Sequence, residues 1–439
     1  MKKISNILLL CLSISAIYGQ ELDVLTKREA IAETLAGNFG IIIARNNVEI
    51  SENNKSLLNS GYLPSVTGNA GANYNLEDQE VTFRDGTVNV VEDAETTRYN
   101  AAVNLNYTLF DGLGRLYNYK RLQEEYQLTE LQARETIEVT LLQLFSVYFE
   151  VARLTENVSV LEETFQNTKN RLTRAEYNFE YGQVSKLEVL NAEVDIVTDS
   201  INLLNAKQQL INAKRDLNVV TNEDLERTFT VDTVVRFTST LQIENFLAQV
   251  DTTNVRLLQA SQNIKISEYN YKASKAVFLP SVGLTGGYGW NEGNFPTTSF
   301  ATSSTTTGFN AGVSLTWDLF DGGGGITSVK NAKIQNTNQE LVKQQIVSEV
   351  RRDIANARGT YENRLQIFRL QEQNVETARN NYERSNERYK LGQITSLELR
   401  QAQINLLNAQ TNKNLAKYEA KLAELELLQL TGQLLNVDI

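Results

Sequence analysis

The chain has 439 residues, and its 53 aspartate and glutamate side chains outnumber its 42 lysine and arginine side chains, giving a formal net charge of −11 at pH 7. An acidic chain of this kind is a poor nucleic-acid binder, because the phosphate backbone attracts basic proteins. It has no histidine and one cysteine. The usual histidine-based nucleophilic triads are therefore not possible, and we expect neither enzyme activity, nor a metal site, nor a cofactor.

The N-terminus has the pattern of a secretory signal peptide. Two lysines precede an apolar run over residues 7–17, and we expect cleavage between Gly19 and Gln20. The run is too short to span a bilayer as a helix, which argues against a membrane anchor. The single cysteine, Cys11, lies inside this run without the small residues of a lipoprotein signal. We therefore predict that residues 1–19 are a signal peptide and that the mature chain has no lipid anchor.

Four later segments alternate between apolar and polar residues with a period of two, the pattern of β-strands with two unlike faces. Each runs for about 9–11 residues, the length of a tilted strand that crosses a bilayer. We expect the apolar face to contact lipid and the face of Asn, Gly, Ser and Thr to contact water, with Phe110, Trp317 and Phe320 in the interfacial girdle. The apolar positions are Val66, Gly68, Ala70, Ala72, Tyr74 and Leu76; Tyr99, Ala101, Val103, Leu105, Tyr107 and Leu109; Val282, Leu284, Tyr288 and Trp290; and Phe309, Ala311, Val313, Leu315, Trp317 and Leu319.

Polar stretches join the two strands of each pair. Residues 76–98 are acidic and residues 291–308 are rich in Ser, Thr and Gly, so we expect two exposed loops at one end of two hairpins. A soluble β-sandwich is the alternative. It is disfavoured because no other part of the chain resembles the strands of a sandwich.

The remainder of the chain has the pattern of long helices. Residues 114–181 and 326–391 contain no proline and keep a heptad-like apolar spacing. At 1.5 Å per residue each helix would extend about 100 Å, which requires a coiled-coil partner. Asp111 and Asp321 are expected to cap the N-termini of these helices. The expected partners are helices over residues 185–220 and 395–430, and a shorter helix is expected before each pair of strands, over residues 27–60 and 243–276.

The same elements occur twice in the same order. The Leu-Phe-Asp-Gly motif of residues 109–112 recurs at residues 319–322, and the Gly-Gln-Val-Ser motif of residues 182–185 recurs as Gly-Gln-Ile-Thr at residues 392–395, both 210 residues later. A period of this length is far too long for a solenoid unit and indicates a duplicated domain around a pseudo-symmetry axis. The predicted organisation is a first structural repeat over residues 20–221, a linker over residues 222–240 and a second structural repeat over residues 241–439.

Four strands cannot close a barrel by themselves. An open sheet edge in hydrocarbon leaves unpaired backbone groups that cost several kcal/mol each, so other copies of the chain must complete the barrel. Two chains would give eight strands and three would give twelve, and the small inward-facing side chains cannot fill an eight-stranded lumen. We therefore favour three chains, with the helices extending the barrel into a conduit that crosses the periplasm.

These motifs resemble those of the outer membrane efflux protein family of TolC-like channels. They are the Leu-Pro-Ser-Val entry into a strand at residues 63–66 and 279–282, the Leu-Phe-Asp-Gly exit into a long helix, and the Tyr-x-x-Gly-Gln turn of residues 389–393 followed by Leu-Glu. The resemblance implies a homotrimer in the outer membrane, with a twelve-stranded transmembrane β-barrel and a twelve-helix coiled-coil tube in the periplasm. It also implies two partners, a periplasmic adaptor and an inner-membrane transporter, in a tripartite efflux or type I secretion system. Drug efflux, metal efflux and protein secretion all occur in the family, and the motifs are common to these branches.

The resemblance places the turn between each long helix and its partner helix at the periplasmic tip, where an adaptor would bind. Gly182 and Gly392 are expected to end the long helices in the left-handed conformation. The candidate adaptor-contacting residues are Gly182, Gln183, Val184, Ser185, Gly392, Gln393, Ile394 and Thr395.

Glu188 and Glu398 have two interpretations. Each fits a capping box with the Ser or Thr three residues before it, in which the glutamate accepts a hydrogen bond from the cap residue's backbone N–H. The resemblance instead implies acidic residues that narrow the closed pore, at these positions and three residues later. The later positions are Asn191 and Gln401, so half of that pattern is present. A trimer would place six such glutamates around its axis, and we expect a ring of this kind to favour cations.

Arg174 and Arg384 lie two turns before the tip glycines and are candidate tethers that hold neighbouring helices together and keep the tip closed. The alternative is a solvated flanking position of a coiled coil. A structural or adhesive coiled-coil surface protein is the main rival to a channel. It accounts for the long helices but not for four amphipathic strands of bilayer length.

Overall fold

The computed structural model describes residues 24–437, so the predicted signal peptide over residues 1–19 lies outside the described residues. The chain divides into two compact units. Among the described residues, one unit contains residues 24–46, Leu131–Leu258 and residues 346–437, and the other contains Asn47–Glu130 and Gln259–Gln345. None of the helices within residues 24–437 has both the length and the apolar character needed to cross a membrane.

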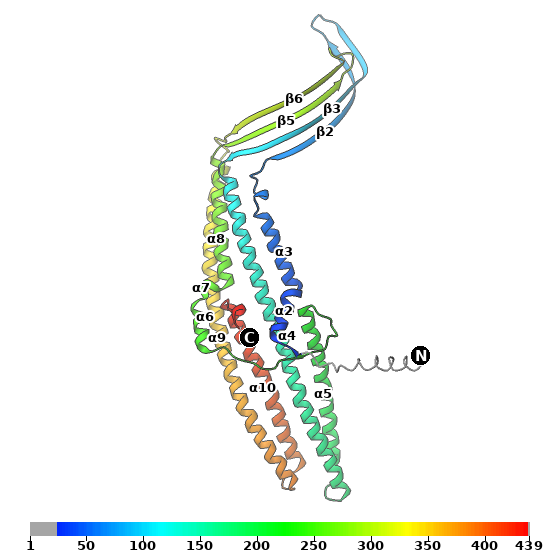
Figure 1. Cartoon of the computed structure of the whole chain (residues 1–439), viewed down its shortest axis with the longest axis vertical. Coiled ribbons are helices and arrows are strands. Elements are labelled where there is room, and N and C mark those ends of the chain that lie inside the picture. The colour runs from blue at the N-terminus through cyan, green and yellow to red at the C-terminus, as the bar shows by residue number, and fades with distance from the viewer. Residues whose placement is uncertain (1–23, 438–439) are drawn as a thin grey trace, which may run out of the picture. The chain divides into compact units, whose positions relative to one another are not determined.

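Helices make up most of the described chain (Figure 1). The two longest, α4 and α9, have 67 residues each, as the sequence predicts. The carboxylate of Asp111 accepts a hydrogen bond from the backbone N–H of Arg115, and that of Asp321 from Gly325, so both predicted N-terminal caps are confirmed. The helices in chain order are α2 (Lys27–Gly37), α3 (Phe39–Asn54), η1 (Leu57–Asn59), α4 (Gly114–Glu180), α5 (Lys186–Thr221), α6 (Thr240–Ala248), α7 (Val250–Thr253), α8 (Val255–Ser274), η2 (Lys275–Phe278), α9 (Gly324–Lys390), α10 (Ser396–Leu430) and η3 (Leu434–Asn436).

The shorter helices are interrupted where the sequence predicts continuous ones. The expected helix over residues 27–60 breaks at Asn38, and the one over residues 243–276 breaks at Asn254, with a further interruption at Gln249 between α6 and α7. Both asparagines have extended backbone conformations and use the side-chain oxygen to cap the helix that follows, through the N–H of Gly40 and of Leu257. Asparagine competes well for such backbone hydrogen bonds, which explains the two breaks.

The two breaks also make the same long-range contact. The side-chain amide of Asn38 donates to the carbonyl oxygen of Val220 at 3.0 Å, and that of Asn254 donates to the carbonyl oxygen of Leu430 at 2.7 Å. In each case the acceptor lies in the last turn of the helix that follows a long helix, α5 or α10. These hydrogen bonds satisfy carbonyl groups that a helix C-terminus otherwise leaves unpaired.

The second unit contains a four-stranded antiparallel sheet in the order β2-β3-β5-β6 (Figure 1). Its register brings the predicted apolar positions of all four strands to one face, as in the row Gly68, Val103, Tyr288 and Phe309. The predicted two-sided character is therefore confirmed at the paired positions of these segments, whereas Leu109 lies at a bulge and the predicted positions Trp317 and Leu319 lie beyond the end of β6. The strands are β2 (Ser65–Thr82), β3 (Val88–Asp111), β5 (Ser281–Asn294) and β6 (Ser303–Thr316), and a separate parallel pair joins β1 (Val24–Leu25) to β4 (Thr230–Val231).

The acidic segment over residues 76–98 is not the loop that we predicted from composition. Paired strands continue through it, with one bulge between Glu77 and Gln79, and end in a tight turn where the N–H of Phe83 donates to the carbonyl oxygen of Thr87 at 2.8 Å. Backbone pairing does not depend on side-chain polarity, so charged residues on both faces did not end the hairpin. In the second hairpin the strands also extend into the predicted loop, and residues 295–302 connect them.

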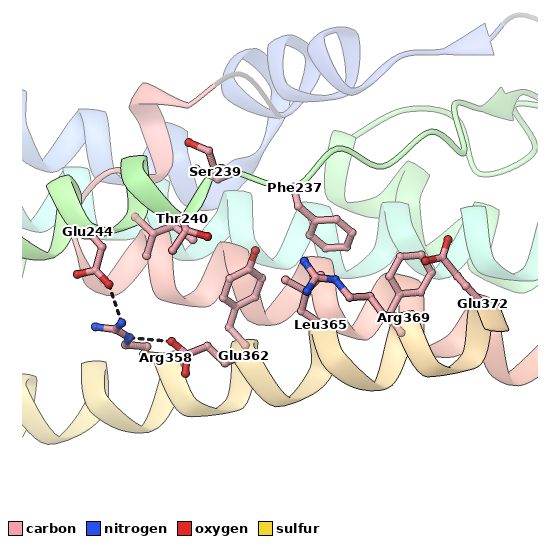
Figure 2. A pocket seen from close by; sticks show the side chains of 13 residues that line it. Phe237, Ser239, Thr240, Glu244, Arg358, Glu362, Leu365, Arg369 and Glu372 are labelled. Atoms are coloured by element: carbon pink, nitrogen blue, oxygen red, sulfur yellow. Dashed lines mark hydrogen bonds and ion pairs between the residues drawn. The ribbon is translucent and has the colours of Figure 1, made fainter. Parts of the chain in front are cut away.

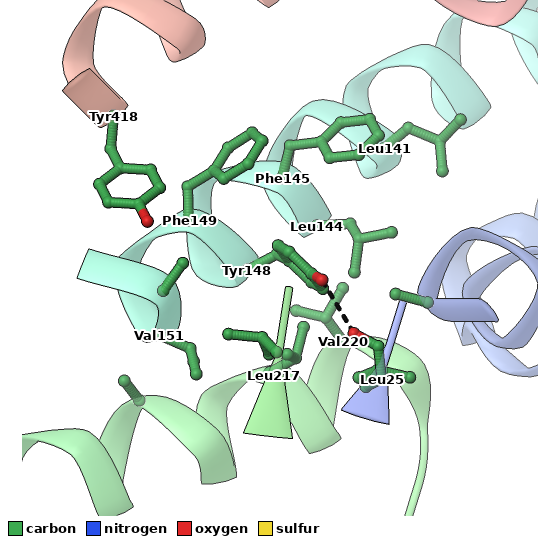
Figure 3. Close-up of a cluster of buried hydrophobic side chains, with 14 of the residues drawn as sticks. Leu25, Leu141, Leu144, Phe145, Tyr148, Phe149, Val151, Leu217, Val220 and Tyr418 are labelled. Carbon is green, nitrogen blue, oxygen red and sulfur yellow. Dashed lines mark hydrogen bonds between the residues drawn. The ribbon is translucent and has the colours of Figure 1, made fainter. Parts of the chain in front are cut away.

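The largest hydrophobic core of the first unit lies around the middle of α4 (Figure 3). Phe145, Tyr148 and Phe149 are fully buried there, and Phe149 packs against Tyr418 of α10 with ring centroids 5.7 Å apart. The Tyr148 hydroxyl donates to the carbonyl oxygen of Leu25 at 2.8 Å and accepts from the backbone N–H of Asp232 at 3.0 Å. Burial raises the pKa of Tyr148 to about 12, so the hydroxyl stays protonated and keeps both contacts at neutral pH.

The linker over residues 222–240 is held to the helices by a buried ion pair. Lys421 donates to the carbonyl oxygen of Arg236 and to the carboxylate of Glu424, both at 2.8 Å. Glu424, which is fully buried, accepts from the N–H and the hydroxyl of Thr238 and from the hydroxyl of Tyr361. Because each charge has several hydrogen-bond partners, this pair fixes the path of the linker along α10.

Candidate functional site: the two hairpin tips

The helices α4 and α5 form one hairpin and α9 and α10 form another, and each ends in a tight turn. We call residues 181–188 the first tip and residues 391–398 the second tip. Gly182 and Gly392 have φ of 70° and 72°, which confirms the predicted left-handed conformation. At the first tip the N–H of Gly182 donates to Phe179 and that of Gln183 to Asn178, and the second tip repeats both hydrogen bonds. This Schellman pattern satisfies the last carbonyl groups of the long helices.

Both tips expose apolar side chains beside the turn. Tyr181 and Leu187 at the first tip are 76% and 64% exposed, and Leu391 and Leu397 occupy the matching positions of the second tip with similar exposure. The polar turn residues that we predicted are exposed as well, whereas Val184 and Ile394 are half-buried. The sequence analysis missed the four apolar residues, although their common offset of 210 residues from one tip to the other was available as a signal.

The second tip has the predicted capping box. The backbone N–H of Thr395 donates to the Glu398 carboxylate at 2.7 Å, and the N–H of Glu398 donates to the Thr395 hydroxyl at 3.3 Å. Hydrogen bonds from the backbone and the side chain of Thr395 lower the pKa of Glu398 below its usual value of 4.5. The carboxylate of Glu398 is therefore charged and fixed in direction at neutral pH.

The first tip lacks this arrangement, so the capping box that we predicted between Ser185 and Glu188 is wrong. Ser185 has the backbone conformation of a cap residue, but its side chain makes no capping hydrogen bond. Within residues 24–437 the Glu188 carboxylate has no hydrogen-bond or ion-pair partner, so it is free to contact solvent, ions or another chain.

The two tip arginines also differ in whether they contact another residue of the described chain. A guanidinium N–H of Arg174 donates to the carbonyl oxygen of Lys390 at 2.9 Å, and the guanidinium lies 5.5 Å from the ring centroid of Tyr389. Arg174 thus joins α4 of the first hairpin to the C-terminal end of α9, where a cation is favoured by the helix dipole. Arg384 is exposed, and it has no hydrogen bond or ion pair to any other residue in the described part of the chain.

A buried ionic network joins the hairpins on the side of Arg174 away from the tips. Arg400 of α10 donates to both carboxylate oxygens of Asp199 on α5, at 2.8 Å and 2.7 Å, while Thr168 of α4 donates to the same carboxylate at 2.7 Å. Arg171 of α4 pairs with Asp195 of α5. Asp199 is only 3% exposed, so its charge depends on these donors. Sequence reasoning missed this network because its members lie on three helices that only the fold brings together.

The first unit also contains a cavity of about 370 Å³ between the linker, α6 and α9 (Figure 2). The rings of Phe237 and Phe368 form one wall, 5.9 Å apart. Arg358 on another wall pairs with Glu244 and Glu362, at 2.6 Å and 2.9 Å. The lining therefore contains charged groups of both signs, and Arg358 is held between two glutamates.

Comparison with known proteins places the chain in one family. The family model for "Outer membrane efflux protein" matches residues 30–223 and 247–433. The chain is 22% identical to the outer membrane protein TolC of Vibrio cholerae, across 87% of this chain and 84% of that protein. It is also 22% identical to the outer membrane efflux protein BepC of Brucella suis, across 94% and 88% of the two chains.

Solved structures have the same fold. The CmeC outer membrane channel of Campylobacter jejuni matches with a TM-score of 0.74 at 18% identity, across 93% of this chain and 86% of that one. CusC matches with a TM-score of 0.74 at 16% identity, across 92% of both chains. With the family model matched over both halves, the chain belongs to the outer membrane efflux protein family, and it serves in the outer membrane as an exit duct for efflux.

Proposed function

We propose that three copies of the chain form one conduit, with a twelve-stranded transmembrane β-barrel continued by a twelve-helix coiled-coil tube. The observation that carries this proposal is the four-stranded sheet, in which β2 and β6 are edge strands and one face is apolar. In a bilayer such edges must pair, since each unpaired backbone group costs several kcal/mol in hydrocarbon. Joining β6 of one copy to β2 of the next closes the sheet, and three copies supply a barrel wide enough for a lumen.

An apolar stripe on α5 supports a matching contact between the helices of neighbouring copies. Its members follow heptad spacing and are exposed, from 45% at Ile211 to 66% at Val194. Heptad spacing of this kind requires a helix partner, and α4 packs on the opposite side of α5. The apolar stripe consists of Leu187, Leu190, Val194, Val197, Ile201, Leu204 and Ile211, with the polar Gln208 at one heptad position between Leu204 and Ile211.

The proposed partner surface is a stripe on α9, mostly of Asn and Thr with Ile367 and Leu370 at its centre. It has heptad spacing, is exposed at every position and contains no charge until Arg384 at its end. A contact between α5 of one copy and α9 of the next uses two different surfaces, and repeating it closes a ring. Arg384 would then face the neighbouring copy and act as a tether between chains, while Arg174 acts within one chain. The α9 stripe consists of Asn356, Thr360, Asn363, Ile367, Leu370, Asn374, Thr377, Asn381 and Arg384.

The chain is also proposed to be an internal duplication, with repeats over residues 20–221 and 241–439 joined by the linker over residues 222–240. The equal lengths of α4 and α9 support this division. The paired contacts of Asn38 with Val220 and of Asn254 with Leu430 support it as well. Two similar repeats in three copies would give the tube six similar hairpins.

The periplasmic tips are the proposed docking site for an adaptor that connects the conduit to an inner-membrane transporter, in a tripartite efflux or type I secretion system. The exposed turns and their flanking apolar residues, Tyr181, Leu391 and Leu397, support this role, because exposed apolar groups of this kind mark surfaces that bind another protein. Glu188 and Glu398 are proposed to narrow the pore at the tips, with Asn191 and Gln401 three residues further on.

Assembly and conduction test this proposal together. The wild-type chain, purified in detergent, is expected to have the mass of a trimer and to conduct ions in planar bilayers. Val197→Asp combined with Leu204→Asp should prevent trimer formation, because it places charges in the apolar stripe. Thr198→Asp, at an adjacent exposed position outside the stripe, should leave the trimer intact. A wild-type chain that remains monomeric in detergent and conducts no ions would overturn the proposal.

A further inference from the structure

A second stripe of exposed residues runs along α5 and α10, apart from the apolar stripe. Its members recur at intervals of three and four residues, so they share one face of each helix. Nearly all of them are amides, and the two helices have corresponding sets. We call these the amide stripes: Thr198, Asn202, Asn205, Gln209 and Asn212 on α5, and Gln401, Asn405, Asn408 and Asn412 on α10.

On α5 the amide stripe lies opposite the linker. The linker contacts α5 through Lys214, whose ammonium lies 5.6 Å from the Phe229 ring, through Arg215, which pairs with Glu226, and through Asn218. At 100° per residue Lys214 and Asn218 lie about half a turn from the amide stripe, and Arg215 lies about a quarter of a turn from it.

The same relation holds on α10. The linker contacts α10 through Lys417 and Lys421, which donate to its carbonyl groups, and through Glu424. These positions are again about half a turn from the amide stripe of that helix. Connecting segments run over the outer surface of a protein, so the amide stripes of both helices face away from that surface and toward the axis of a tube.

Carboxylates end both stripes at corresponding positions. The same heptad spacing leads to Glu188 and Glu398 at the tips, and to Asp216 and Glu426 at the other end of the hairpins. The two levels are 28 residues apart on each helix, or about 42 Å along its axis. Asp216 and Glu426 are exposed and have no hydrogen-bond or ion-pair partner within the described part of the chain.

The charged residues that fall between these levels on the same faces are already paired. Asp195 on α5 binds Arg171, and Glu419 on α10 binds Arg364. Between the two carboxylate levels, the α5 face therefore presents amides and Thr198, and the α10 face presents amides with Leu415 and Leu422; neither face has an unpaired charge there among the described residues. Amide side chains both donate and accept hydrogen bonds, so they hold water without attracting ions of either sign.

We propose that the amide stripes line the lumen, giving the helical section of the conduit an uncharged, hydrated wall between two acidic levels. One level is formed by Glu188 and Glu398 and the other by Asp216 and Glu426, with six carboxylates at each level of a trimer. Hydrated cations and neutral polar solutes pass such a wall most readily, while anions are disfavoured at both ends. This inference rests on the proposed trimer.

Cysteine accessibility tests the orientation of the amide stripes. The single native cysteine, Cys11, lies in the predicted signal peptide, so the mature chain offers a cysteine-free background. A charged thiol reagent added to Asn408→Cys channels in a planar bilayer should reduce the current. The same reagent should label Arg369→Cys, which lines the cavity beside the linker, without changing the current. Equal block of both variants, or block of Arg369→Cys alone, would overturn the inference.

Reversal potentials in a KCl gradient test the second acidic level. Asp216→Asn combined with Glu426→Gln should lower the permeability of K⁺ relative to Cl⁻ by about twofold or more. Adding Glu188→Gln and Glu398→Gln should abolish the remaining preference. Glu372→Gln, the same chemical change beside the linker, is the matched control and should have no effect. If the variant channels are trimeric and conduct ions but their K⁺/Cl⁻ selectivity is unchanged by replacing Asp216 and Glu426, this inference is wrong while the proposed function stands. If the wild-type chain forms no trimer and conducts no ions, the proposed function is wrong.

Discussion

The two hairpin tips begin from nearly the same sequence but have different chemistry. At the second tip Thr395 and Glu398 form a closed capping box, and Arg384 nearby has no partner within the described residues. At the first tip Ser185 makes no capping hydrogen bond, Glu188 has no partner within residues 24–437, and Arg174 is engaged with α9. The comparison indicates a division of roles. The first tip holds the two hairpins of one chain together and offers a free carboxylate, while the second keeps its carboxylate fixed and offers a free cation to a neighbour.

The largest expected effect comes from breaking the buried ionic network that joins the two hairpins. Arg400→Ala leaves the 3% exposed Asp199 without its bidentate partner. An unpaired buried charge of this kind costs about 3–5 kcal/mol of stability. Thermal unfolding in detergent, followed by helical circular dichroism, should show a clear loss of stability in Arg400→Ala. Arg400→Met combined with Asp199→Leu removes both charges and should recover most of it; if the double variant is as unstable as Arg400→Ala, the ionic explanation is wrong.

The next largest effect is expected from replacing the tip arginines Arg174 and Arg384. Arg174→Ala removes a hydrogen bond to a helix C-terminus and a contact with the Tyr389 ring, and we expect a cost of about 1–2 kcal/mol within one chain. Arg384→Ala should leave the stability of a detergent-dissociated monomer unchanged. In the assembled trimer, both variants should raise the resting conductance if both arginines tether the tips. An Arg384→Ala trimer with unchanged conductance would assign Arg384 to a solvated flanking position.

A smaller effect on stability is expected from replacing the residues at the N-termini of α10 and α5, Thr395 and Ser185. Thr395→Ala should destabilise the start of α10 by about 1 kcal/mol, the usual cost of losing an N-terminal cap. Ser185→Ala should be nearly neutral, because its side chain makes no capping hydrogen bond. Local amide hydrogen exchange in the first turns of α10 and α5 measures both. Equal losses of protection at the two tips would contradict the difference between them.

Much of this fold was predictable, because it depends on patterns that are local in sequence. Alternation with a period of two identified both faces of the sheet, and the absence of proline together with apolar heptads predicted α4 and α9 almost to the residue. Gly182 and Gly392 were predictable because a helix that ends in a left-handed residue strongly prefers glycine.

The features that escaped prediction depend on competition or on tertiary contacts. The hairpin over residues 76–98 continues because backbone pairing outweighs the polar composition, and the helices break at Asn38 and Asn254 because each side chain finds backbone partners on two sides. The difference between the Ser185 and Thr395 caps lies in side-chain hydrogen bonds that the shared motif does not distinguish. The network around Arg400 joins residues more than 200 positions apart, for which no local pattern exists.

The smallest expected effect is a pH dependence confined to the second tip. The folded-state pKa of Glu398 is lowered by its hydrogen bonds to Thr395, so its contribution to stability is fully present above the ordinary value of 4.5. That contribution is lost as the pH falls below 4.5 and through the lowered pKa of the folded state. The backbone amide of Leu399 should therefore be less protected against hydrogen exchange at acidic pH, after correction for the pH dependence of exchange in an unfolded chain. The backbone amide of Val189, the corresponding residue of the first tip, should keep its protection on acidification, because Glu188 has no capping hydrogen bond to lose. If both tips lost protection in parallel as the pH fell, the capping box would not be what distinguishes them.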